Sequence, residues 1–182
     1  METSLQDSAP QAATEPLDLE ALYHRHADFV WRCLRRLGVR DANLDDAVQE
    51  VFLVVHRRLG DLHAPEGVRS WLFAIAFNVA RDHRRAAQRK GLAEPLPETL
   101  RDPLPDPSQA LSQREDLRLL DAALDTLDDP RRAVFVLTEI EQLTAPEIAS
   151  ALGVNLNTVY SRLRLARADF ERAVARLRRR TP

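Results

Sequence analysis

The stretch LTAPEIASALGVNLNTVYSRLRLARADF, residues 143–170, has the pattern of two helices separated by a tight turn. Thr144 and Glu147 have the spacing of a capping box at the start of the first helix. Gly153 stands where that helix has to end, because glycine adopts a positive φ without strain. Asn155 then provides a favourable N-cap for the second helix. The pattern predicts a helix-turn-helix.

Both faces of this helix pair can be assigned from the spacing of the residues. Five apolar residues are expected to hold the helices together: Ile148, Leu152, Val154, Val159 and Leu163. The exposed face of the second helix should carry Asn157, Thr158, Tyr160, Ser161, Arg162 and Arg164. These side chains can hydrogen-bond base edges or phosphates in a major groove. An ordinary helix pair with a solvated basic face is the alternative, but the order of capped helix, glycine turn and capped basic helix favours DNA binding.

The composition excludes several classes of protein. The chain has 182 residues, 45% of them apolar, and its few glycines and aromatic residues favour helices over sheets. Cys33 is the single cysteine, so no internal disulfide can form, and the five histidines have no ligand or nucleophile spacing. No glycine-rich phosphate loop is visible. We therefore expect no enzyme, no catalytic residue, no metal and no cofactor.

The N-terminal residues are polar and acidic, and they do not resemble a signal peptide. No apolar run approaches the roughly 20 residues that span a bilayer. The sequence therefore predicts a cytoplasmic protein that does not insert into a membrane.

The predicted fold class is all-α, with two small helical domains joined by a flexible proline-rich linker. The expected parts are a disordered tail (1–16), a first domain (17–90), the linker (91–110) and a second domain containing the helix-turn-helix (111–182). In the first domain we expect helices at about 17–37, 44–59 and 70–89, with Gly38 closing the first and Asn43 capping the second. In the second we expect helices at about 113–127, 130–142, 145–152 and 157–180. The linker should let the two domains move independently.

The near-neutral net charge of -2 hides an uneven distribution. Residues 92–130 contain ten acids against three arginines, whereas residues 155–182 contain eight arginines against two acids. The arginines at 178–180 are expected to attract phosphates without reading sequence.

Four segments, in this order, resemble the extracytoplasmic-function (ECF) subfamily of bacterial RNA polymerase sigma factors. They are LDDAVQEVFLVVHRRL, RSWLFAIAFNVARDHRRAAQR, ALDTLDDPRRAVFVLTEIEQLTAPEIASALGV and NTVYSRLRLARADF. The resemblance covers roughly residues 17–178, with a linker where the family has one. It implies a factor that binds core RNA polymerase, directs it to promoters through the −35 and −10 elements, and promotes DNA opening.

The resemblance also implies roles for individual residues. The helix containing DDAVQEVF would dock on the clamp helices of the largest polymerase subunit, through Asp45, Asp46, Gln49, Glu50 and Phe52. From the residues alone, an acidic face on a helix with an apolar opposite side is usually a solvated surface.

The −10 element would be bound by the loop before the third helix and by that helix. The implied residues are His63, Arg69, Trp71, Asn78, Arg81, Arg84 and Arg85. An aromatic ring can stack on an unpaired base while arginines follow the DNA backbone. Trp71 can equally be a packing residue at the start of the helix.

The −35 element would be bound in its major groove by the 157–180 helix, with Arg167 added to the exposed residues named above. We expect Arg164 to contact bases, and Arg162 or Arg167 to contact phosphates. Asn157, Tyr160 and Leu165 depart from the residues that the family often has there, which leaves the promoter sequence open.

The expected partners are core RNA polymerase, promoter DNA and an anti-sigma factor, and we expect the free protein to be a monomer. The alternative is a stand-alone regulator that binds duplex DNA without polymerase. Its first domain should then resemble a ligand-sensing or phosphoacceptor module, whereas here a basic helix adjoins an aromatic residue.

Overall fold

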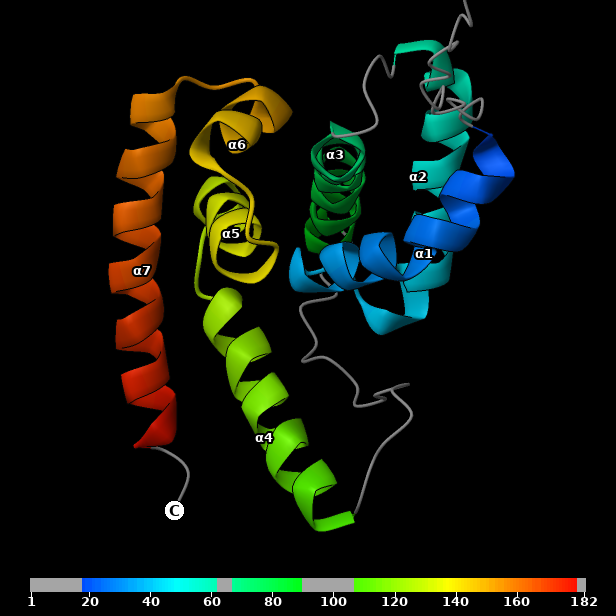
Figure 1. The fold of residues 1–182 in the computed structure, drawn as a ribbon. Coiled ribbons are helices and arrows are strands. Elements are labelled where there is room, and N and C mark those ends of the chain that lie inside the picture. The colour runs from blue at the N-terminus through cyan, green and yellow to red at the C-terminus, as the bar shows by residue number, and fades with distance from the viewer. Residues whose placement is uncertain (1–17, 62–66, 90–106, 180–182) are drawn as a thin grey trace, which may run out of the picture.

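The computed structural model describes residues 18–61, 67–89 and 107–179, and every long element within them is a helix (Figure 1). The helices are α1 (Leu19–Arg36), α2 (Leu44–Arg57), α3 (Val68–Arg89), α4 (Pro107–Leu124), α5 (Asp129–Phe135), α6 (Ala145–Leu152) and α7 (Leu156–Arg178). The predicted tail and most of the predicted linker lie outside the described residues. Of the described helices, none is long and apolar enough to cross a membrane.

Helices α1, α2 and α3 pack against one another and form the N-terminal block. Their buried residues recur at helical spacing, which is why each helix has one apolar face. The predicted core residues of α1 and α3 are confirmed as buried: Leu22, Phe29, Val30, Cys33, Leu34, Leu37, Leu72, Ile75, Ala76 and Val79. Burial raises the pKa of the Cys33 thiol well above its usual range, so the thiol is a neutral core group.

The ends of these helices follow the sequence signals with one exception. Gly38 has φ +88° just after α1, as expected for the glycine that closes a helix. Asn43 occupies the N-cap position of α2, but its side chain makes no capping hydrogen bond. The reason is that the chain enters α2 from a short 3₁₀ turn, Asp41–Asn43, rather than from extended backbone.

In the C-terminal block, α4, α5 and α6 pack against α7. Helix α4 begins at Pro107, inside the segment predicted as linker, because proline is well tolerated in the first turn of a helix. The predicted helix at 130–142 is divided into α5 and a π-helical segment, Val136–Ile140. This segment ends at Ile140, and Gln142, two residues further on, has φ 60°.

The structure confirms the predicted caps of the helix-turn-helix. The carboxylate of Glu147 accepts hydrogen bonds from the backbone N–H (2.8 Å) and the hydroxyl (2.6 Å) of Thr144. These bonds lower the pKa of Glu147, the side-chain bond contributing most. Gly153 ends α6 with φ 63°, and Oδ1 of Asn155 accepts from the Thr158 N–H at 2.8 Å. Ile148, Val159 and Leu163 are buried, whereas Leu152 and Val154 are half-buried.

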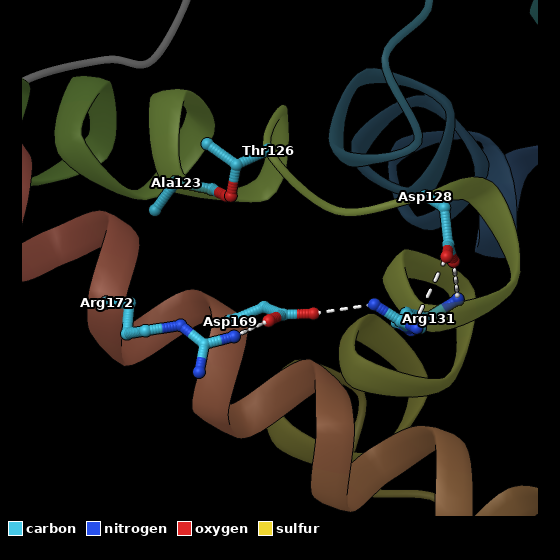
Figure 2. A network of polar contacts seen from close by, with 6 residues as sticks. All are labelled: Ala123, Thr126, Asp128, Arg131, Asp169 and Arg172. Carbon is cyan, nitrogen blue, oxygen red and sulfur yellow. Dashed lines mark hydrogen bonds and ion pairs between the residues drawn. The ribbon is translucent and has the colours of Figure 1, made fainter.

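Polar and aromatic contacts fix α7 against α5, and Figure 2 shows the polar ones. Asp128 caps α5 by accepting from the Arg131 N–H at 2.9 Å, and Nη1 of Arg131 reaches Oδ2 of Asp169 in α7 at 2.7 Å. Arg172 pairs with the other oxygen of Asp169. The Phe135 and Phe170 rings stack with centroids 4.5 Å apart. These contacts set the direction in which α7 projects.

The two blocks pack against each other. The sequence analysis expected domains that move independently and did not predict this contact. Helix α3 contacts α6, and the C-terminal end of α1 lies beside α5 (Figure 1). The buried apolar residues form one continuous cluster that contains members from Leu22 in α1 to Ala166 in α7. We call the contact between the blocks the seam.

We expect Asn155→Ala to lower the free energy of unfolding by about 1 kcal/mol, because the Thr158 N–H loses its capping acceptor. Chemical denaturation followed by circular dichroism measures this change. Asn157→Ala is the matched control, since Asn157 is exposed two residues further along and does not cap the helix. Equal stability of the two variants would contradict the capping role.

Candidate nucleic-acid interface

The first turns of α7 present a polar face to solvent. Asn157, Tyr160 and Arg164 are exposed, and Tyr160 keeps 58% of its surface accessible. Arg164 makes no ion pair with any residue of the described chain. An amide, a phenol and a guanidinium at spacings of three and four residues lie on one side of a helix. This side of α7 can enter a major groove without first breaking contacts within the protein.

Other predicted residues of α7 already have partners inside the protein. The Thr158 hydroxyl donates to Oδ1 of Asn155 at 2.9 Å, and the Ser161 hydroxyl donates to the Thr158 carbonyl at 3.1 Å. Arg167 donates to Oε1 of Glu139 through Nε at 2.8 Å. Arg162 is half-buried, so it lies further from the exposed centre of the face than Arg164. Leu165, one of the atypical residues, is 38% exposed.

Helix α3 carries a second group of predicted DNA-binding residues. Arg85 is exposed, and Asn78 is exposed with its amide donating to the Ala74 carbonyl at 2.9 Å. Trp71 is half-buried and packs against the apolar core, so the packing interpretation describes at least part of its ring. His63 lies outside the described residues.

The remaining arginines of this group lie at the seam. Nη2 of Arg69 is 2.6 Å from Oε2 of Glu141, and the Arg69 guanidinium lies 4.7 Å above the Phe29 ring. Nη1 of Arg84 is 2.7 Å from Oδ1 of Asp129. Arg81 and Arg84 line the same narrow space, next to Asp129 and Arg132. Three of the seven predicted residues are therefore covered or paired by the C-terminal block.

The polar face of α2 is open to solvent. Asp45, Asp46, Gln49 and Glu50 are all exposed, and Glu50 lies 3.2 Å from Nε2 of His83 in α3. Phe52 corrects the prediction for this face, because only 7% of its surface is accessible. Its ring packs edge-on against Tyr23 with centroids 4.8 Å apart. Phe52 packs on the buried side of α2, whereas Tyr23 and Leu53 are the exposed large apolar side chains beside it.

The sequence analysis missed the residues that join the two blocks. Glu141 and Arg132 are both buried. Glu141 pairs with the guanidinium of Arg36 in α1, and Arg132 donates a hydrogen bond to the backbone carbonyl of Arg36 at the end of α1. Burial lowers the pKa of Arg132, while Asp125 opposes the shift, so its guanidinium stays charged. The acid-rich segment 92–130 contains Asp121 and Asp129 of the seam but neither Glu141 nor Arg132, and its composition does not indicate which arginines its acids pair with.

Comparison with known proteins assigns both blocks. The family described as sigma-70 region 2 matches residues 22–90, and the family described as sigma-70, region 4, matches residues 117–170. RNA polymerase sigma factor NccH of Alcaligenes xylosoxydans xylosoxydans is 32% identical over 153 residues, which are 82% of each chain. The ferric citrate uptake sigma factor FecI of Escherichia coli is 36% identical over 149 residues, covering 80% of this chain and 84% of FecI.

A solved structure has the same fold. The structure of CnrH in complex with the cytosolic domain of CnrY matches with a TM-score of 0.63 and 28% identity, over 86% of this chain and 87% of CnrH. The alternative of a stand-alone regulator has no support among these relatives, which are sigma factors. The chain belongs to the extracytoplasmic-function sigma factors, the transcription initiation factors that direct core RNA polymerase to promoters.

Proposed function

We propose that α7 binds the −35 element, that α3 with the loop before it binds the −10 element, and that α2 binds the clamp helices of the largest polymerase subunit. The observation that carries the proposal is the exposed, unpaired face of α7 at Asn157, Tyr160 and Arg164. In this proposal residues 17–90 form the region 2 domain and residues 111–182 the region 4 domain, joined by the linker at 91–110.

Within α7 the proposal divides base contacts from phosphate contacts. Each residue advances about 100° around a helix, so Arg162 lies well round from Arg164, towards the DNA backbone. Arg164 is exposed and unpaired among the described residues, which leaves its planar fork of donors available for a guanine edge. Arg167 already pairs with Glu139, so phosphate binding there would exchange one anionic partner for another.

Helix α3 can follow an opened strand with its exposed side. Asn78 and Arg85 are accessible as the chain stands, and Trp71 can offer the open part of its ring to a base. Arg69, Arg81 and Arg84 complete the set, and phosphate binding at Arg69 and Arg84 would replace their carboxylate partners Glu141 and Asp129. His63 is retained in the proposed −10 contacts on the resemblance alone.

The polar face of α2 suits a basic surface on polymerase. Four acidic or amide side chains at i, i+1, i+4 and i+5 are accessible and lie opposite the buried residues of the same helix: Asp45, Asp46, Gln49 and Glu50. We withdraw Phe52 from direct contact because it is buried, and it remains a packing residue for this surface.

Further aspects of the proposal follow from the family. CnrH was solved with CnrY, and we propose that an anti-sigma factor likewise binds this chain. We propose that the free chain is a monomer, with one recognition helix for one promoter element, and that it acts in the cytoplasm. We also propose that it acts by binding alone, without enzymatic activity, metal or cofactor.

Reversing the charge at Asp46 and Glu50 together should weaken binding to core polymerase, because two accessible carboxylates would become repulsive to a basic partner surface. Affinity is measured by fluorescence anisotropy of the labelled full-length variant D46K/E50K. Helicity by circular dichroism should not change.

The matched control is E115K/D116K, which reverses two exposed adjacent acids on α4. It should retain the affinity of the unmodified chain for core polymerase. Undiminished binding of D46K/E50K would remove α2 from the proposed polymerase contact.

Arg164→Ala should relax the preference at one position of the −35 element and cost about 1–3 kcal/mol there, as expected for loss of a base contact. Selection from a promoter library by the reconstituted holoenzyme measures this preference. A phosphate contact would instead weaken all promoters equally and lower the salt slope by about one unit.

Arg176→Ala is the control, since Arg176 is exposed on α7 about three turns further on. Its −35 preference should stay the same. If Arg164→Ala also kept the −35 preference, the base contacts would have to be assigned instead to Asn157, Thr158, Tyr160 or Ser161.

A further inference from the structure

Glu139 and Arg167 form an ion pair between the π-helical segment and α7. Oε1 of Glu139 lies 2.8 Å from Nε and 2.7 Å from Nη2 of Arg167, so one carboxylate oxygen accepts from one edge of the guanidinium. The two side chains keep 35% and 54% of their surface accessible, respectively. An exposed pair of this kind adds little to the stability of the fold. Its effect therefore lies in the orientation that it gives to the arginine.

The backbone that carries Glu139 is held firmly against α7. Glu139 belongs to the π-helical segment Val136–Ile140, whose wider turn rotates the side chains that follow it relative to a continuous α-helix. Leu137, in the same segment, is fully buried. Just before the segment, the Phe135 ring stacks on Phe170 of α7 with centroids 4.5 Å apart. Glu139 is thus directed at α7 from a fixed support.

Arg167 lies on the same side of α7 as the exposed face. Counted from Tyr160, Arg164 lies about 40° round the helix in one direction and Arg167 about 20° in the other. Along the helix axis Arg167 is about 10 Å beyond Tyr160, a distance similar to the depth of a major groove, about 8.5 Å. When the first turns of a recognition helix contact bases, a residue at this height lies level with the phosphates. Arg167 is therefore placed for the DNA backbone.

The ion pair leaves part of the Arg167 guanidinium available. Glu139 takes Nε and Nη2, whereas Nη1 makes no hydrogen bond or ion pair with the residues that the structure describes. The five N–H donors of an arginine are enough for two anions on different edges. A phosphate that approaches Nη1 can bind while Glu139 stays in place. Only a phosphate at the Nε edge would have to exchange partners.

We propose that Glu139 is a positioning residue for promoter binding, which holds the Arg167 guanidinium so that its Nη1 edge meets a phosphate beside the −35 element. The proposal rests on the assignment of Arg167 to a phosphate made above. A long side chain that is already ordered loses less conformational entropy when it binds. Glu139 thereby strengthens binding, although its own negative charge repels DNA. Orientation and charge act in opposite directions, so an experiment can separate them.

The variant E139A tests the proposal in the reconstituted holoenzyme. The probe is the promoter duplex that the unmodified holoenzyme selects from the promoter library, and fluorescence anisotropy measures affinity over a range of salt concentrations. E139A should weaken binding about threefold, the size expected when one long side chain has to be ordered on binding. E139Q should weaken binding less, because its neutral oxygen still accepts from Arg167. Loss of a repulsive charge alone would raise the affinity instead, and that result would overturn the proposal.

E171A is the matched control. Glu171 is an exposed acid about one turn further along α7, and it makes no ion pair with the described residues. Its removal should not weaken binding to the promoter duplex. In the double variant R167A/E139A, loss of Glu139 should no longer weaken binding relative to R167A, because no guanidinium remains to be held. A continued loss in that background would mean that Glu139 acts by another route, against the proposal.

The orientation of the guanidinium can be measured in the free full-length chain. The ¹⁵Nε–¹H heteronuclear NOE reports motion of an arginine side chain on the picosecond to nanosecond timescale. Arg167 should give a higher value than Arg164, which makes no ion pair with the described residues. In E139A the value for Arg167 should fall to that of Arg164. Equal values in the unmodified chain would show that Glu139 does not order Arg167.

R167A separates the role of Glu139 from the phosphate contact itself. It should weaken binding to all promoters alike and lower the salt slope by about one unit. If affinity and salt slope both stay unchanged, the phosphate contact passes to Arg162 and the proposal for Glu139 falls with the assignment of Arg167. If R167A has the expected effect while E139A binds as tightly as the unmodified chain, the phosphate contact stands and the positioning role of Glu139 is refuted.

Discussion

The arrangement of the two blocks depends on the pairing of charge at the seam. Glu141 and Arg132 are charged groups with almost no access to water, and each is tolerated because partners from another element surround it. Removing one partner would leave the other uncompensated in an apolar setting, which is costly. Such contacts give a defined geometry rather than a large gain in stability.

The chemistry of the arginines on α3 suits two kinds of partner. Arginine at the surface of α3 suits both phosphate and carboxylate, because its planar fork of donors matches either acceptor. In this structure the acceptors for Arg69 and Arg84 are Glu141 and Asp129 of the C-terminal block.

The sequence was sufficient to predict the helices but not how the helices of the two blocks pack together. Periodic apolar residues, Gly38, Gly153 and Asn155 are local signals, and the structure confirms the elements that they predict. Phe52 was misplaced because a one-residue error around a helix exchanges a surface position for a core one. The seam could not be predicted, since Arg69 and Glu141 are 72 residues apart and nothing local in either indicates the other.

The outer face of α7 is exposed, whereas part of α3 is packed against the C-terminal block. Contacts with α5 hold α7 from behind, through the stacked Phe135 and Phe170 rings and the Arg131–Asp169 pair, so its outer face needs no partner. Helix α3 has a different constraint, because α6 packs against it. Duplex DNA has a rigid groove that a preformed helix can enter at once. The exposed face of α7 therefore needs no rearrangement before it meets such a groove, whereas Arg69 and Arg84 of α3 would have to leave their carboxylate partners to meet a phosphate.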